Sequence, residues 1–323
     1  MSDALVVAEN LTRWFGGHGL LGRKPTQAVN GVSLTISSGE AVGLVGESGS
    51  GKSTIGRLLL GLLEPTEGRV RLGGRDIASL SSRELRRLRR RVQLVFQDPY
   101  SSLDPRRRVG AQVADGLGIH NIVPLEERPM RVRTLLEQVG LDPTHADRYP
   151  HEFSGGQRQR IGIARALATG PDFVVADEPV SALDVSVQAQ VLALLAGLRE
   201  RLRLSLLFIS HDLPVVRSLC DRVIVLYLGR IMEEGPVDEV MERPRHPYTR
   251  ALLSAAPSID VAGRRRRIVL QGEPPSPSNV PSGCVFRARC PWAMPACAEA
   301  VPLLEPVGPS HRAACIRTDI DIQ

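Results

Sequence analysis

GESGSGKST (residues 46–54) is the stretch of sequence that decides the fold. It follows the apolar segment Ala41 to Val45 and precedes a predicted helix over Ile55 to Leu63. A phosphate-binding loop needs this order, because glycines let backbone N–H groups curl around phosphate oxygens without interfering side chains. We therefore expect a nucleoside triphosphate to bind at Gly46, Glu47, Ser48, Gly49, Ser50, Gly51, Lys52, Ser53 and Thr54.

Two side chains of this loop have chemical roles that follow from their type. Lys52 would place a positive charge at the β- and γ-phosphates, and the Ser53 hydroxyl would bind Mg²⁺. The N-terminus of the following helix adds the positive end of its dipole. Lys52 and Lys24 are the only lysines among 41 basic residues, so arginine has replaced lysine almost everywhere else. The alternative, a chance turn rich in glycine and serine, does not explain the strand before the loop and the helix after it.

Further apolar segments alternate with helical patterns along the chain. This alternation predicts an α/β fold with a mostly parallel sheet. Between Gln97 and Tyr149 the pattern is helical and interrupted by prolines, which indicates a helical insertion. The predicted strands lie around Val32 to Ile36, Ala41 to Val45, Val92 to Phe96, Phe173 to Ala176, Leu206 to Ile209 and Val223 to Tyr227.

Composition restricts the class of protein. The chain has 323 residues, of which 42% are hydrophobic and 24% charged, as expected of a globular protein with one large domain and a smaller one. No apolar run approaches the roughly 20 residues that a membrane-spanning helix requires, and no signal peptide is evident, so we expect a cytosolic protein. The net charge of +6 and the basic run Arg83 to Arg91 raise the alternative of a nucleic-acid-associated ATPase. We interpret the run as a solvated helix face.

Two adjacent carboxylates end an apolar strand in Phe173-Val-Val-Ala-Asp177-Glu178. An ionised Asp177 would join the Mg²⁺ shell, and Glu178 would act as the general base that polarises the attacking water. An apolar strand that ends in two acids is common, so this pattern is specific only because a phosphate-binding loop precedes it.

A further motif, Phe153-Ser-Gly-Gly-Gln-Arg158, resembles the signature sequence of the ABC ATPase family. The resemblance implies the P-loop ABC nucleotide-binding fold with a helical signature subdomain. It also implies that this loop completes the ATP site of a partner subunit, so that two ATPase chains enclose two ATP molecules. The residues that would do so are Ser154, Gly155, Gly156 and Gln157, at the start of a helix predicted from Gln157 to Leu167.

The other positions of the family motif occur in the expected order. By resemblance, Gln97 contacts Mg²⁺ or the attacking water, Asp184 bridges the ATPase dimer, and His211 contacts the γ-phosphate. An aromatic ring stacks on adenine in this family, and either Phe15 or its neighbour Trp14 lies at that place. The alignment of Gly16 favours Phe15, and the alternative is that either ring packs in the core.

The C-terminal part resembles the extension of oligopeptide and dipeptide permease ATPases. The resemblance rests on Arg245-His-Pro-Tyr-Thr-Arg-Ala-Leu-Leu253 and on Pro281-Ser-Gly-Cys-Val-Phe-Arg-Ala-Arg-Cys-Pro291. Three earlier segments are typical of the same subfamily: Phe96 to Pro105, Pro179 to Ser186 and Phe208 to Leu213. The resemblance therefore covers nearly the whole chain except an insert at Gly16 to Pro25. It implies an ABC ATPase domain over 1–255, with its helical subdomain at about 98–165, and an extension over 256–323. The run Arg264 to Arg267 and the segment Glu273 to Gly283 read as a linker.

The resemblance also implies partners and a location. We expect an ATPase on the cytoplasmic face of the inner membrane, peripheral to it, that works with a second ATPase subunit, two transmembrane permeases and an extracytoplasmic solute-binding protein. Whether the second ATPase is identical stays open. Relatives of this kind carry peptides, nickel chelates, glutathione or opines, so the solute is not written in this sequence. No nucleic acid is expected as a partner.

Four of the five cysteines cluster near the C-terminus. Five, six and seventeen residues separate them, which are not the short spacings usual in structural zinc sites. By resemblance to related permease ATPases, they would hold a [4Fe–4S] cluster; zinc and unliganded thiols are the alternatives. A small segment rich in proline favours a ligand that ties it together. The four are Cys284, Cys290, Cys297 and Cys315, with Cys220 separate.

Overall fold

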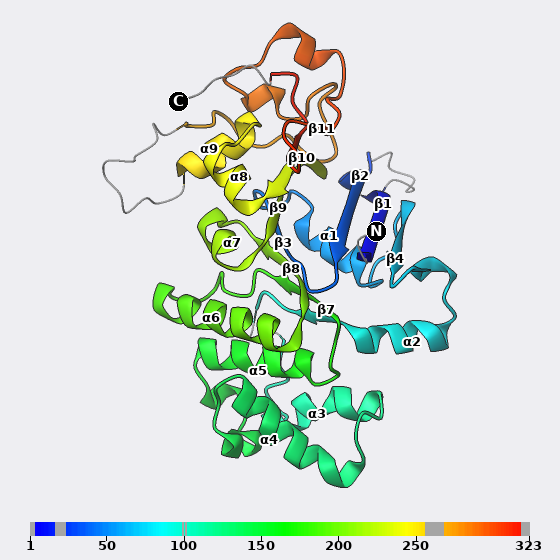
Figure 1. Cartoon of the computed structure of the whole chain (residues 1–323), viewed down its shortest axis with the longest axis vertical. Coiled ribbons are helices and arrows are strands. Elements are labelled where there is room, and N and C mark those ends of the chain that lie inside the picture. The colour runs from blue at the N-terminus through cyan, green and yellow to red at the C-terminus, as the bar shows by residue number, and fades with distance from the viewer. Residues whose placement is uncertain (1–3, 17–23, 99, 101, 256–267, 318–323) are drawn as a thin grey trace. The chain divides into compact units, whose positions relative to one another are not determined.

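A computed structural model describes residues 4–16, 24–98, 100, 102–255 and 268–317 (Figure 1). Within these residues the chain divides into two compact units: Ala4, Ser37–Glu40 and 79–209 form the first, and Leu5–Ile36, Ala41–Ala78 and the described residues of 210–317 form the second. Most of the predicted insert, residues 17–23, and the arginine run 264–267 lie outside the described residues. Within the described ranges, no helix combines the length and the apolar character that crossing a membrane requires.

The first unit combines three parallel strands with a group of helices. Strands β6 (Val92–Val95), β7 (Phe173–Asp177) and β8 (Ser205–Ser210) lie side by side in that order, and β7 and β8 are buried along their whole length. Strands buried on both faces read as continuous apolar runs, as these do. The helices are α2 (Ser82–Arg91), α3 (Val109–Ile119), α4 (Arg128–Gln138), α5 (Gly155–Leu167) and α6 (Val185–Leu202).

The predicted helical insertion is confirmed. Helices α3, α4 and α5 pack against one another, and α5 also packs against α6 (Figure 1). Helix α2 carries the basic run and buries only Leu88, so it is a solvated helix for nearly its whole circumference, as we expected. Arg91 at its end forms an ion pair with Asp172.

The second unit holds the N-terminal strands and everything after β8. One sheet has the order β2-β1-β4-β5, in which β1 with β4 and β4 with β5 run antiparallel. A second group has the order β11-β12-β10-β9-β3, with β3 and β9 parallel and the remaining pairs antiparallel. The strands are β1 (Ala4–Phe15), β2 (Thr26–Ser37), β3 (Ala41–Val45), β4 (Glu67–Leu72), β5 (Arg75–Asp76), β9 (Arg222–Tyr227), β10 (Arg230–Pro236), β11 (Glu305–Pro306) and β12 (Arg312–Ala313).

The helices of the second unit are short, and its C-terminal part is irregular. That part contains two 3₁₀ turns, at Arg287–Arg289 and Pro295–Ala298, and is joined to β10 through β12. The predicted linker contacts β2, because the N–H of Gln27 donates to the carbonyl of Pro277 at 3.0 Å. The helices are α1 (Lys52–Leu59), α7 (Leu213–Leu219), α8 (Val237–Glu242) and α9 (Pro247–Ala255).

Two sequence-based expectations need correction. The helix predicted over Ile55 to Leu63 begins earlier and ends earlier, over Lys52–Leu59, because Gly51 adopts a left-handed conformation and starts the helix directly after the loop. Its last turn closes where Leu62 and Leu63 both donate to the Arg57 carbonyl. The sheet formed by β1, β2, β4 and β5 is the second difference, since the sequence predicts only the strand around Val32 to Ile36 in it.

Candidate active site

The phosphate-binding loop runs from the end of β3 to the start of α1, as the sequence predicts. Gly51 has a φ of 104°, and a Cβ atom at this position would lie 2.2 Å from the carbonyl oxygen of Ala28 in β2. No residue other than glycine fits such a close approach in a left-handed conformation. The loop is therefore held against β2 by backbone packing.

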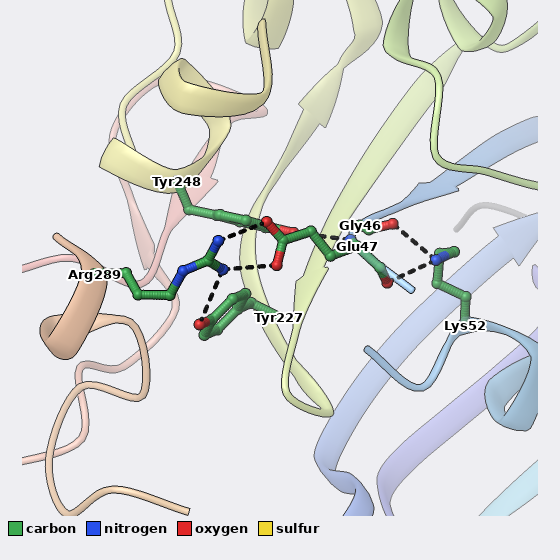
Figure 2. Close-up of polar contacts among 6 residues, drawn as sticks. All are labelled: Gly46, Glu47, Lys52, Tyr227, Tyr248 and Arg289. Carbon is green, nitrogen blue, oxygen red and sulfur yellow. Dashed lines mark hydrogen bonds and ion pairs between the residues drawn. The ribbon is translucent and has the colours of Figure 1, made fainter. Parts of the chain in front are cut away.

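Lys52 lies under the loop and is only 5% exposed. Its ammonium donates to the carbonyl oxygens of Gly46, at 2.7 Å, and of Glu47, at 2.9 Å (Figure 2). The buried Oγ of Ser50 has no hydrogen-bond partner in the part of the chain that the structure describes. A buried hydroxyl without a partner is costly, so this loop has polar capacity that a phosphate oxygen would satisfy.

The side chain of Glu47 extends from the loop toward the C-terminal region (Figure 2). Its two carboxylate oxygens accept hydrogen bonds from Arg289, at 2.7 and 3.2 Å. The backbone N–H of the same residue donates to the hydroxyl of Tyr248, at 2.9 Å. The sequence predicted Glu47 as part of the phosphate site, and it gave no role to Arg289 or Tyr248.

The proposed catalytic carboxylate lies at the end of β7 in the first unit. Asp177, the last residue of the strand, is 8% exposed. Glu178 follows with a φ of 45°, a left-handed conformation that costs a residue with a side chain about 1–3 kcal/mol. Its N–H donates to the carbonyl of Ile209 at 3.0 Å, and its Oε2 accepts from the Gln97 amide at 2.9 Å. Gln97 and Glu178, predicted separately, are thus direct neighbours.

The glycine-rich signature segment forms the start of α5. Ser154 and Gln157 cap this helix reciprocally: the Ser154 hydroxyl accepts the Gln157 N–H at 3.3 Å, and the Gln157 side chain accepts the Ser154 N–H at 3.0 Å. A Cβ atom on Gly156 would lie 2.2 Å from Cγ1 of Val187 in α6. This glycine is therefore required for the packing of α5 on α6.

Asp184 and His211 lie at element boundaries. Asp184 caps α6, where its carboxylate accepts from the N–H of Val187 and from the hydroxyl of Ser186. These hydrogen bonds lower the pKa of the Asp184 carboxyl. His211 is the exposed residue directly after β8.

The two candidate adenine-stacking rings are both exposed. Phe15 ends β1 and is 39% exposed, and Trp14 is 37% exposed. Neither ring packs in the core. The guanidinium carbon of Arg13 lies 4.8 Å from the centroid of the Phe15 ring.

The four clustered cysteines all line one cavity of about 10 Å³, between the two 3₁₀ turns and the C-terminal strand region. None of the five cysteines forms a disulfide. Burial raises the pKa of the thiols of Cys284 and Cys315, and it raises that of Cys290 to about 11. Within the described ranges, no three His, Cys, Asp or Glu side chains are placed closely enough to hold a metal ion.

Sequence reasoning missed the aromatic and arginine contacts that surround the phosphate loop. Tyr227, Tyr248 and Phe286 form a buried group of rings with centroids 4.7 to 5.3 Å apart. Tyr248, Phe286 and Arg289 stand in the two C-terminal segments that carried the family resemblance, but those segments were used only to choose a branch of the family. No sequence pattern predicts a role for this tyrosine and this arginine, because their contacts with Glu47 form only in the folded chain.

A buried strand, a glycine-rich loop and a helix in this arrangement define a protein that binds a nucleoside triphosphate. The chain matches the family models "ABC transporter" over residues 29–181 and "Oligopeptide/dipeptide transporter, C-terminal region" over residues 232–297. It is 61% identical to a putative peptide import ATP-binding protein of Brucella ovis, over 90% of this chain and 92% of that one. It is 52% identical to the oligopeptide transport ATP-binding protein AppF of Bacillus subtilis, over 92% of each chain.

A solved structure supports the same assignment. The dimeric post-hydrolysis structure of the ATP-binding cassette MJ0796, bound to ADP and phosphate, is 33% identical with a TM-score of 0.65, over 72% of this chain and 98% of that chain. The chain belongs to the ABC transporter family, in the branch with the oligopeptide/dipeptide transporter C-terminal region. It is an ATPase, and ATP and Mg²⁺ are its substrate and metal.

Proposed function

We propose that this chain lies at the cytoplasmic face of the cell membrane and there hydrolyses ATP to drive the import of peptides or related small solutes into the cell. The observation that carries the proposal is the identity of 61% to peptide import ATP-binding proteins over 90% of the chain, including the C-terminal region that matches oligopeptide/dipeptide transporters. The predicted division into an ATPase domain over 1–255 and an extension over 256–323 is part of the proposal.

Uptake of labelled di- and oligopeptides by cells tests this directly. Cells that lack the gene should lose uptake, the wild-type gene should restore it, and a Lys52→Ala gene should not. The deleted strain could instead take up peptides fully and lose the uptake of a nickel chelate, glutathione or an opine. That result would assign a different solute to the transporter and would leave the ATPase role in place.

At the phosphate loop, we propose that Lys52 leaves its two carbonyl partners, or shares them, to contact the β- and γ-phosphates. The buried Ser50 hydroxyl and the loop N–H groups supply further donors. The proposed Mg²⁺ ligands are Ser53, Gln97 and Asp177, whose oxygen atoms are the donor type that Mg²⁺ prefers. When bound, Mg²⁺ neutralises charge on the phosphate oxygens.

For hydrolysis, we propose Glu178 as the general base and Gln97 as the residue that orients it. The amide of Gln97 donates to the Glu178 carboxylate at 2.9 Å, and this hydrogen bond fixes the orientation of the proposed base. His211 would contact the γ-phosphate, and Phe15 would stack on adenine, since its ring is exposed at the end of β1. These roles rest on the family resemblance and on the local geometry of each residue.

The proposal includes partners. Ser154, Gly155, Gly156 and Gln157 would contact the nucleotide of a second ATPase subunit, and Asp184 would lie at the same interface, in a complex with two permeases and an extracytoplasmic binding protein. The purified chain should then hydrolyse ATP slowly and with a rate that rises with protein concentration. Rapid turnover by a chain shown to be monomeric in the same buffer would contradict this dependence on a partner.

We also propose that Cys284, Cys290, Cys297 and Cys315 bind metal, as a [4Fe–4S] cluster. The donor chemistry fits, because all four thiols line one cavity. The cavity between the thiols, about 10 Å³, holds roughly one water molecule, and no three of these side chains are arranged to hold a metal ion within the described residues, so the four thiols must rearrange to bind a cluster. Burial raises the pKa of the thiols of Cys284, Cys290 and Cys315, so a bound cation would favour their thiolate form.

Anaerobic purification distinguishes the three outcomes for these cysteines. A cluster should give brown protein with iron and sulfide, both lost in Cys284→Ser and retained in Cys220→Ser. Colourless protein with one zinc ion would assign a zinc site, which needs less space. Metal-free protein that is stable and active would leave the thiols as apolar packing groups.

A further inference from the structure

The peptide unit and side chain of Glu47 are held at three points. The Glu47 carboxylate accepts hydrogen bonds from both terminal nitrogens of Arg289 (Figure 2). The Glu47 N–H donates a hydrogen bond to the Tyr248 hydroxyl, and the Glu47 carbonyl accepts one from the Lys52 ammonium at 2.9 Å. All four residues belong to the same compact unit. Two of the three contacts come from the C-terminal region, and the third comes from the phosphate-binding lysine.

The contact between Arg289 and Glu47 is largely shielded from water. The Arg289 side chain is 8% exposed and that of Glu47 is 27% exposed. Burial disfavours the charged guanidinium, yet the hydrogen bonds to Glu47 and Tyr227 raise the pKa of Arg289 above its ordinary value. A shielded pair with two parallel N–H to oxygen bonds is the strong form of an ion pair, and the loss of one member leaves the other charge uncompensated.

An acidic residue inside a phosphate-binding loop needs such compensation. A free Glu47 carboxylate would add negative charge to the loop that must receive a triphosphate, and it would allow the Glu47 peptide to rotate. Arg289 removes both problems, because it neutralises the carboxylate and fixes its position. Tyr248 occupies the Glu47 N–H, so the donors left for phosphate are those of the other loop residues.

We propose that the C-terminal region is a brace for the phosphate-binding loop, in which Arg289 and Tyr248 are positioning residues that set the affinity for ATP through Glu47. The inference rests on the proposed role of the loop as the phosphate site. Arg289 directly precedes Cys290, which lines the cysteine cavity. The conformation of the segment that holds Cys290 therefore determines where the Arg289 guanidinium lies. The C-terminal region in this sense is the one matched at residues 232–297, which holds both Tyr248 and Arg289, and it thereby acts on ATP binding without contacting ATP.

Equilibrium binding of a fluorescent ATP analogue to the full-length chain, without turnover, tests the brace. Arg289→Gln should raise the Kd on the order of 10-fold, as expected for the loss of hydrogen bonds to a charged group. Arg287→Gln is the matched control: it lies in the same 3₁₀ turn and donates to Ser282 rather than to the loop, so its Kd should equal that of wild type. Glu47→Gln combined with Arg289→Gln should weaken binding by less than the product of the two single effects, because both act on one contact.

Two further variants separate the possible failures. Tyr248→Phe keeps the buried ring and removes only the acceptor of the Glu47 N–H, so it should raise the Kd severalfold even if Arg289→Gln fails to fold. Lys52→Ala should weaken binding strongly; if it binds normally, the loop is not the phosphate site and the proposed function fails. If Lys52→Ala weakens binding while Tyr248→Phe and a folded Arg289→Gln bind as wild type does, the brace is refuted.

Discussion

Glu178→Gln is the substitution that tests the proposed chemistry most sharply. The carboxylate accepts a hydrogen bond from the Gln97 amide at 2.9 Å, and the carbonyl oxygen of a glutamine side chain can accept the same bond. The left-handed backbone at this position, with φ of 45°, is equally strained for both residues. The substitution therefore keeps the shape and the contact with Gln97, and it removes the negative charge and with it the ability to take a proton from water.

A general base contributes about 10²- to 10⁴-fold to a rate, which corresponds to about 3–5 kcal/mol of activation free energy. We expect kcat to fall by that factor in the assembled complex, with the ATP Kd changed by no more than about threefold. Phosphate release and analogue binding, measured on the same preparation, give the two quantities. ATP-bound dimers should accumulate in gel filtration.

Gln97→Ala serves as the comparison, because it leaves the Glu178 carboxylate and removes the hydrogen bond to it together with one proposed Mg²⁺ ligand. Its effect on kcat should be smaller than that of Glu178→Gln. The reasoning is refuted if Glu178→Gln turns over within threefold of wild type, or if it loses ATP binding as completely as turnover. The second result would mean that the residue holds the nucleotide rather than the water.

Three further predictions concern the packing and the pH dependence of the fold. Gly156→Ala should destabilise the chain by about 1–3 kcal/mol, because its Cβ would lie 2.2 Å from Val187, whereas Gly155→Ala, with a nearest atom at 3.4 Å, should melt as wild type does. Phe286→Ala, which removes a fully buried ring, should cost about 3–5 kcal/mol in chemical denaturation, and the 72%-exposed Val269→Ala should cost nothing measurable. Burial lowers the pKa of His246 from 6.5 to about 4, only partly opposed by Glu233. The unfolded chain therefore binds more protons between these values, and stability should fall by up to about 3 kcal/mol as pH drops from 6.5 to 4. An equally steep pH dependence in His246→Gln would contradict that assignment.

Local sequence was sufficient to predict the phosphate loop and most strands of the larger sheet. Gly51 and Lys52 occur in a contiguous pattern whose function depends on backbone conformation and on the start of a helix, both of which are set by neighbouring residues. The predicted strands from Val92 to Phe96, Phe173 to Ala176 and Val223 to Tyr227 were confirmed within one residue at each end. The last two are buried almost throughout, and strands buried on both faces are apolar along nearly their whole length. Most strands of the sheet formed by β1, β2, β4 and β5 were not predicted, since β1 and β4 are only partly buried and mix polar with apolar residues.

The sequence by itself determined the family, the phosphate loop, the carboxylate pair and the order of the motifs, because each of these is written in a short contiguous stretch. Only the tertiary structure decided what those residues contact. It placed the Gln97 amide on Glu178 and the Arg289 guanidinium on Glu47, residues that lie 81 and 242 positions apart in the chain. No local pattern encodes such pairs, because they form only when strands and turns from distant segments fold together and bring the two side chains within hydrogen-bonding distance.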